Sequence, residues 1–162
     1  MADSTFDVVS DFDQQELVNA LDQVRREVAT RYDFKGAKVS IELGKDGITL
    51  QADDEYRATS VKDLIQSKAV RRNLSLKIFD WGKLEPAAGG TVRQHIGLRR
   101  GLTSEQAKEI SKIVRDNFPK LKPSIQGDAV RVAGKSRDDL QAVIGHLRGL
   151  DYPVALQFEN YR

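Results

Sequence analysis

The sequence predicts an α+β protein of two halves, each with the order strand, helix, strand, strand, helix, strand. Short runs in which apolar and polar residues alternate indicate strands, and longer runs with apolar residues every three or four positions indicate helices. The segment 81–91 contains Pro86 and the pair Gly89-Gly90, which is typical of a linker, and the order of elements repeats after it. A length of 162 residues fits two such small halves.

The first half is predicted to span residues 1–80. The pattern Asp13-Gln-Gln-Glu16 is a capping box that begins the first helix, and the turn Gly44-Lys-Asp-Gly47 joins the second and third strands into a hairpin. The second helix is predicted at about residues 55–72. The alternating runs place the strands of this half at residues 6–10, 39–43, 48–52 and 74–78.

The second half is predicted to span residues 92–162. Thr103 begins its first helix with Gln106 at the capping-box position, and Phe118-Pro119 ends it, because the residue before proline is pushed out of the helical region. Gly127-Asp128 is a two-residue hairpin signal, and Ser136 begins the last helix. The strands of this half are predicted at residues 92–98, 125–126, 130–132 and 154–158. Both halves thus follow βαββαβ, the ferredoxin-like order, and each is small enough that we expect them to pack together.

Composition excludes several classes of protein. Hydrophobic residues make up 40% and charged residues 31%, which predicts a globular chain. The sequence has no apolar run long enough for a membrane span and no signal-peptide pattern at its start, so we expect a cytoplasmic protein that does not bind membranes. With no cysteine and only two histidines, His95 and His146, we expect no metal and no cofactor.

The net charge of +2 hides an uneven distribution along the chain. Residues 1–80 hold 12 basic and 15 acidic residues, a net charge of −3, whereas residues 81–162 hold 14 and 9, a net charge of +5. This asymmetry predicts an anionic partner for the second half.

The junction between the third strand and the last helix of the second half is the strongest candidate site. Free backbone N–H groups at the start of a helix attract phosphate, and here they would lie beside Lys135, Ser136 and Arg137. The equivalent junction in the first half, residues 52–55, is acidic. Alternatively, Ser136 only caps the helix and the basic side chains stay solvated. A P-loop is excluded, because position 129 is Ala129 where that motif needs glycine.

Nucleic-acid binding is a second interpretation of the ferredoxin-like order, because RNA-recognition modules share it. The predicted third strands carry no aromatic residue for base stacking, so RNA would have to be held by charge. The basic residues available for such contacts, or for a nucleotide phosphate, are Arg93, Arg99, Arg100 and Arg131.

The segment Arg31-Tyr-Asp-Phe-Lys-Gly36 combines two rings, two cations and a glycine. A base stacked on Tyr32 or Phe34 would place its phosphate near Arg31 or Lys35. Alternatively, Phe34 closes the first helix onto the sheet. No set of residues supplies a nucleophile, a base and a stabilising group together, so we expect no enzyme activity.

Several stretches of the chain are distinctive: Phe6-Asp-Val-Val-Ser10, Arg31-Tyr-Asp-Phe-Lys-Gly36, Arg93-Gln94, Gly101-Leu-Thr103 and the long run from Ile125 to Val143. Together they resemble the YajQ family of bacterial nucleotide-binding proteins over essentially the whole chain. The resemblance implies two ferredoxin-like domains that exchange their first strands, so that residues 6–10 pair in the second domain and residues 92–98 in the first.

The resemblance also implies a function. It predicts a non-enzymatic nucleotide-binding protein that senses a guanine nucleotide such as cyclic di-GMP, or binds GTP or ATP, and acts through a protein partner such as a transcription regulator. It also implies weak nucleic-acid binding, so an RNA-binding or ribosome-associated accessory protein is the alternative. An adaptor that binds only proteins is a third possibility. No ligand contacts follow from the resemblance, and the site residues named above rest on their own chemistry.

Overall fold

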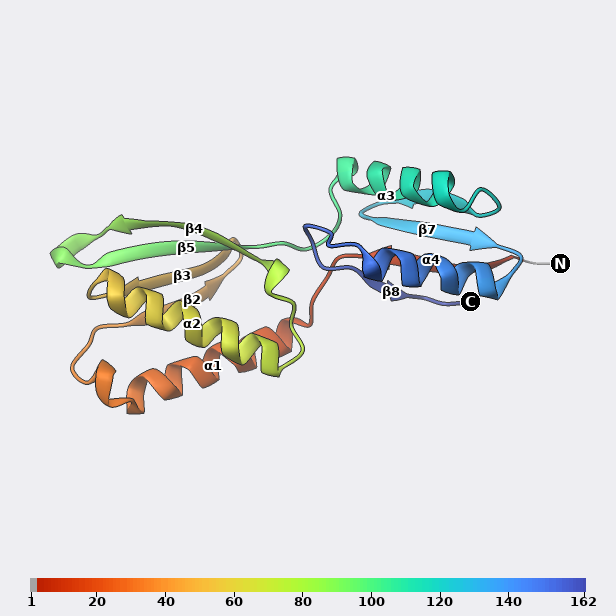
Figure 1. Cartoon of the computed structure of the whole chain (residues 1–162). Helices are drawn as coiled ribbons and strands as arrows, with labels where there is room; N and C mark the ends of the chain where they lie inside the picture. Colours follow the sequence, from red (N-terminus) through yellow and green to blue (C-terminus); the bar gives the residue numbers. More distant parts are fainter. Residues whose placement is uncertain (1–2) are drawn as a thin grey trace. The chain divides into compact units, whose positions relative to one another are not determined.

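The computed structural model describes residues 3–162 and has an α+β fold with two four-stranded antiparallel sheets (Figure 1). The chain divides into two compact units. We call Phe12–Arg99 the central unit, and residues 3–11 together with Arg100–Arg162 the terminal unit.

The central unit has a sheet of strand order β2-β3-β5-β4, with both helices along one face (Figure 1). The core between sheet and helices includes Leu21, Ile48, Ile65 and Ile96, all fully buried. The elements of this unit are α1 (Gln14–Thr30), β2 (Ser40–Gly44), β3 (Gly47–Ala52), α2 (Glu55–Arg71), β4 (Phe79–Pro86) and β5 (Val92–Leu98).

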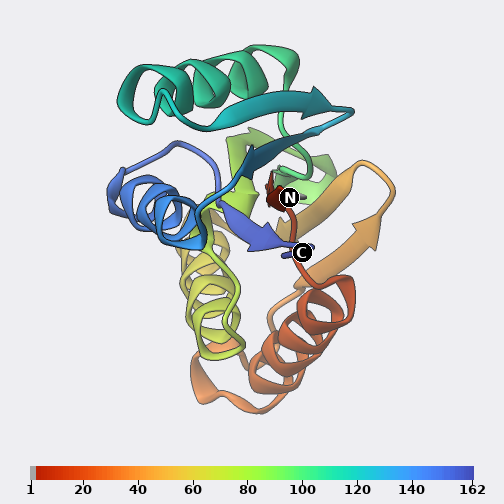
Figure 2. The same cartoon turned by 90° about the vertical axis from the view of Figure 1, so that its right-hand side faces the viewer.

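The terminal unit has a sheet of order β6-β7-β1-β8, and both ends of the chain belong to it (Figure 2). Thr5 and the last residue, Arg162, exchange backbone hydrogen bonds of 2.9 Å in both directions. Phe6 and Val8 of β1 are fully buried in the core of this unit. Its elements are β1 (Ser4–Val9), α3 (Ser104–Asn117), β6 (Lys122–Gln126), β7 (Ala129–Gly134), α4 (Arg137–Gly149) and β8 (Gln157–Glu159).

Each sheet has the strand order of a ferredoxin-like fold. In the terminal unit, β1 lies between β7 and β8, and the elements α3, β6, β7, α4 and β8 complete βαββαβ. In the central unit, β5 takes the equivalent place between β3 and β4, although it follows both of them in the sequence. The predicted fold class, α+β with two ferredoxin-like domains, is confirmed.

Local capping chemistry sets the helix starts where the sequence predicts them. Thr103 and Gln106 form a complete capping box at the start of α3. The Asp13 side chain accepts hydrogen bonds from the amides of Gln15 and Glu16 at the start of α1. Gly127, with φ of +61°, turns the β6–β7 hairpin.

The sequence-based elements are wrong in the region 74–91, and the last strand, predicted at residues 154–158, begins only at Gln157. The predicted strand at residues 74–78 contains instead a 3-10 turn, Leu76–Ile78, and the predicted linker at residues 81–91 holds most of β4. A bulge between Trp81 and Leu84 shifts the register of β4, so the alternation of apolar residues is broken there. Pro86 ends an edge strand, a position where the missing N–H is tolerated.

A buried carboxylate fastens β1 to its neighbours. Asp7 of β1 accepts a hydrogen bond of 3.0 Å from Arg131 Nε of β7 and one of 2.9 Å from Asn160 Nδ2 beyond β8. The Arg131 hydrogen bond lowers the pKa of Asp7 below its ordinary value of 3.8, against the opposing effect of burial. The ionised form of Asp7 is therefore the one that stabilises the folded chain.

We expect Asp7→Asn to lower the free energy of unfolding at pH 7 by about 1 kcal/mol. Because the folded pKa is lowered, the contribution of Asp7 is present above its ordinary, unfolded pKa of 3.8 and is lost as pH falls through the lowered value. The difference from the parent protein should therefore shrink as pH drops from about 5 toward 3, measured by urea unfolding. Asp80→Asn, which removes an exposed carboxylate 3.5 Å from Arg99, is the control and should change stability by less than about 0.5 kcal/mol.

Gly47 starts β3 with φ of +129°, and a Cβ there would clash with the backbone carbonyl oxygen of Ile96 on β5. We expect Gly47→Ala to cost at least about 2 kcal/mol, from the strained backbone and the clash together. Gly44→Ala, at the other end of the same turn, is the control. Its Cβ would meet nothing closer than 3.9 Å, so its effect should stay within about 1 kcal/mol. Equal urea midpoints for the two variants would contradict this account.

Candidate functional site

A basic hollow of about 480 Å³ lies at the junction of β7 with α4. Lys120, Lys122 and Lys135 line it together with the carboxylates of Asp3 and Asp139. Three ammonium groups against two carboxylates leave the hollow with a net positive charge. This junction is the one that the sequence predicts as a phosphate site.

The start of α4 forms one wall of the hollow. Ser136 is the capping residue, and its hydroxyl accepts a hydrogen bond of 3.3 Å from the Asp139 amide. The first amides of a helix have no partner within the helix, and the helix dipole adds partial positive charge there. Ser136 thus caps the helix, and the basic side chains gather at the same place.

Packing between β6 and β7 brings Lys120 and Lys122 to this junction. Leu121, which lies between them in the sequence, is 3% exposed and packs against Gly134, where a Cβ would collide with the Leu121 side chain. Lys122 pairs with Ala133 across the β6–β7 ladder. The burial of Leu121 therefore places its two sequence neighbours, Lys120 and Lys122, close to Lys135.

Lys120 and Lys122 were not identified as site residues from the sequence, although the hairpin pattern contains the information that places Lys122. A two-residue turn at Gly127-Asp128 fixes the register of the hairpin, and counting back from it puts Lys122 opposite Ala133. Lys120 lies outside β6, and its position depends on the burial of Leu121. That contact is tertiary, so no local pattern predicts it.

Two of the predicted basic residues near this junction lie outside the hollow. Arg137 is exposed and is the first residue of α4, but it does not line the hollow. Arg131 lies on the sheet face opposite the helices, because its neighbours Val130 and Val132 are buried in the core. Its guanidinium is paired with Asp7, which raises the pKa of Arg131 through their hydrogen bond.

The equivalent junction of the central unit, between β3 and α2, has the opposite chemistry. The Asp54 side chain caps α2 by accepting a 2.8 Å hydrogen bond from the Arg57 amide, and Asp53 Oδ2 accepts one of 2.8 Å from the Lys38 amide. Both carboxylates are thus occupied by backbone N–H groups and would repel phosphate. Of the two helix starts, only the one at α4 is basic.

The four arginines predicted as a basic surface are divided between the units. Arg93 and Arg99 belong to the central unit, and Arg100 and Arg131 to the terminal unit. Arg99 donates to the carbonyl oxygens of Lys77 and Phe79 at 3.2 Å, while Arg100 is paired with Asp11 at 2.8 Å. Three of the four side chains therefore already have partners within their own unit.

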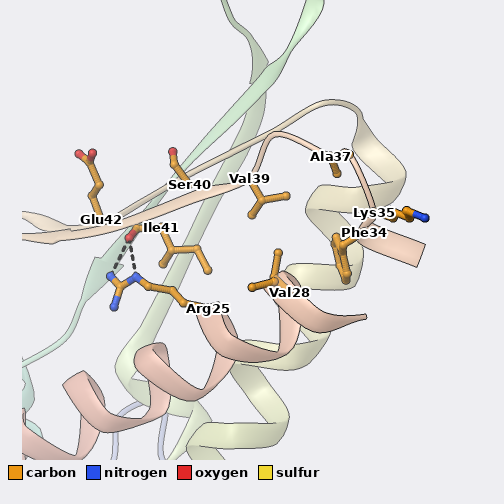
Figure 3. Close-up of a pocket in the computed structure, with 11 residues that line it drawn as sticks. Arg25, Val28, Phe34, Lys35, Ala37, Val39, Ser40, Ile41 and Glu42 are labelled. Atoms are coloured by element: carbon orange, nitrogen blue, oxygen red, sulfur yellow. Dashed lines mark hydrogen bonds between the residues drawn. The ribbon is translucent and has the colours of Figure 1, made fainter. Parts of the chain in front are cut away.

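Of the segment 31–36, Phe34, Lys35 and Gly36 line a second hollow, of about 600 Å³, in the central unit (Figure 3). Arg31 is held by Asp33 through hydrogen bonds of 2.9 and 2.7 Å and lies 5.4 Å from the centre of the Phe34 ring. Phe34 is only 3% exposed, which agrees with the alternative that it closes the first helix onto the sheet. Tyr32 is the exposed ring, at 87%, and Lys35 lines the hollow.

The charge asymmetry between the halves does not carry over to the units. The terminal unit, counted with its first residues, contains 11 basic and 11 acidic residues, and the central unit 15 and 13. The change arises because Asp3, Asp7 and Asp11 belong to the terminal unit, whereas Lys83, Glu85, Arg93 and Arg99 belong to the central one. Any attraction for an anion must therefore come from local clusters such as the lysines beside α4.

Two kinds of site are absent from residues 3–162. No group of three or more His, Cys, Asp or Glu side chains in this range is arranged to hold a metal ion. No helix in the same range has the length and apolar character to cross a membrane.

Comparison with known proteins identifies the family of this chain. The model of the family described as "Nucleotide-binding protein YajQ-like" matches residues 4–162. A protein of Chloroflexus aurantiacus is 60% identical over 99% of both chains, and one of Thermosynechococcus vestitus is 58% identical over 98% of this chain and 97% of its own. A third, from Trichodesmium erythraeum, is 54% identical over 98% of both chains, and all three are named as nucleotide-binding proteins. The chain therefore belongs to the YajQ-like family of nucleotide-binding proteins.

Proposed function

We propose that this protein is a non-enzymatic sensor of an anionic guanine nucleotide such as cyclic di-GMP, and that the hollow at the start of α4 holds the nucleotide's phosphate. The observation that carries the proposal is the convergence of Lys120, Lys122 and Lys135 on one helix start. The names of the relatives support a nucleotide as the ligand. The preference for guanine and for a cyclic dinucleotide rests on the resemblance to the family.

Phosphate binding at this place follows from ordinary electrostatics. Phosphate oxygens accept charge-assisted hydrogen bonds from the lysine ammonium groups, and the helix start adds backbone N–H donors. Ser136 keeps the helix start in place through its bond to Asp139. Arg137, exposed at the first turn of α4, lies within the same local field and strengthens the attraction for an anion.

Signal output requires a second binding event, which we assign to a protein partner such as a transcription regulator. A bound nucleotide covers the exposed ammonium groups of the hollow and neutralises their charge. The surface that a partner meets at β7 and α4 therefore differs between the free and the loaded protein. A partner that binds the two forms with different affinity reads the nucleotide concentration.

A calorimetric titration with cyclic di-GMP, GTP, ATP and a short RNA tests the ligand class. We expect saturable heat with a guanine nucleotide and weaker binding of ATP. Affinity that rises with polyanion length and falls steeply with salt would instead favour the RNA-binding alternative. The proposal is wrong if no nucleotide gives saturable heat.

Substitutions in the hollow test where the phosphate is held. We expect Lys122→Ala and Lys135→Ala each to weaken nucleotide binding by about 1 to 3 kcal/mol, because each removes a charge-assisted hydrogen bond. Lys112→Ala removes an exposed lysine of α3 that does not line the hollow, and should leave affinity unchanged. If Arg131→Ala lowers nucleotide affinity and the two hollow variants do not, the phosphate is bound on the opposite face of the sheet.

A further inference from the structure

Three of the four outer strands carry features that discourage pairing with another chain. β4 has a bulge between Trp81 and Leu84 and ends in Pro86, β6 contains Pro123, and β8 is three residues long. β2 differs, because its five residues pair with β3 in unbroken register and include no proline. β2 is therefore the outer strand whose free edge suits a further strand.

A side chain covers the free edge of β2 in place of a strand. Arg25 of α1 donates to the Ile41 carbonyl oxygen through Nε at 3.1 Å and Nη2 at 2.6 Å (Figure 3). This carbonyl therefore points away from β3. In an antiparallel ladder the backbone groups of successive residues point alternately toward and away from the partner strand. The backbone groups of Leu43 thus also point away from β3, while those of Ser40 and Glu42 form hydrogen bonds with it. The guanidinium occupies the place that the N–H of an added strand would take.

The hollow of about 600 Å³ runs along the same edge, between α1 and β2. Val28, Phe34, Val39 and Ile41 point toward one another across it (Figure 3). The segment that joins α1 to β2 closes one end, because it connects the two walls. Alternate side chains of a strand added to β2 would point into this apolar space.

Charge on the rim of the hollow selects among possible strands. Two cations line it, Arg25 and Lys35, and Glu42 is the one carboxylate among its lining residues in the described chain. Arg25 Nη1 also pairs with Asp22 Oδ1 of the same helix at 2.8 Å, but both side chains are exposed, and a surface ion pair of this kind is weak. Glu42 points to the other side of β2, away from Val28 and Phe34 (Figure 3). A strand with acidic side chains beside its apolar ones matches this arrangement.

We propose that the β2 edge and its hollow bind an extended segment of another protein, with apolar side chains at alternate positions and acidic side chains at its ends. The peptide N–H replaces the Arg25 guanidinium on the Ile41 carbonyl, and a carboxylate of the peptide takes the place of Asp22 on the released guanidinium. Apolar side chains fill the space between Val28 and Val39. This site lies in the central unit and does not depend on the phosphate site at α4.

The test uses the full chain labelled with nitrogen-15 and a pool of capped octapeptides with Val, Ile or Leu at alternate positions, Thr or Ser between them and Glu at both ends. A second pool carries Lys in place of Glu. We expect saturable amide shifts at Ile41 and Leu43, larger than those at Ser40 and Glu42, and hydrogen exchange at Ile41 slowed at least about tenfold. The Glu pool should bind at least about tenfold more tightly than the Lys pool.

Arg25→Gln provides the matched variant, with Arg26→Gln on the same helix as its control, because Arg26 does not line the hollow. We expect the preference for the Glu pool to fall about tenfold in the first variant and to persist in the second, with the amide spectrum outside the hollow unchanged in both. Equal binding of the two pools, equal shifts at Ser40 and Ile41, or no shift at millimolar peptide would overturn the proposal. So would shifts at Ile41 that depend on protein concentration alone, which would make the occupant a second copy of this chain.

Discussion

Backbone pairing of one inner strand in each sheet, β1 in the terminal unit and β5 in the central unit, is the constraint on which the rest of the structure depends. β1 lies between β7 and β8, and β5 between β3 and β4, so each sheet has its buried centre filled by a strand with apolar residues on the helix side. Phe6 and Val8 on β1 and Ile96 on β5 are fully buried, and each packs in the core of its own unit. Without these strands neither sheet could cover its pair of helices.

The same pairing decides where charge is placed. It brings Asp7 against Arg131, a contact between residues 124 positions apart, and this contact withdraws the arginine from the set of cations open to a ligand. Because β1 and β5 each pair in the other half's sheet, the two units also carry more nearly equal net charges than the two halves of the sequence. Net charge alone therefore does not explain why one part of the chain would attract anions. The remaining attraction for an anion comes from a local cluster of lysines. The packing of Leu121 on Gly134 holds Lys120 and Lys122 beside the start of α4.

The two hollows differ in the physical basis of recognition. The one at α4 combines ammonium groups with a helix start, so it suits a compact anion that needs several donors. The one beside β2 combines apolar side chains with a free strand edge, so it suits a chain that brings its own alternating N–H and C=O groups. Because one lies in each unit, a variant in one hollow leaves the other's residues untouched.

Periodicity, capping residues and turn signals were sufficient to predict four helices, the two hairpins, the fold class and the contrast between a basic and an acidic helix start. These features are local, because they depend on residues within about four positions of one another. Tertiary structure alone decided that β4 continues through the segment taken for a linker, that Phe34 is buried, and that Lys120 joins Lys135. It also decided the partners of Arg131. These features depend on contacts between groups that are far apart in the sequence. The periodicity of apolar residues, two in a strand and 3.6 in a helix, carries no information about such contacts.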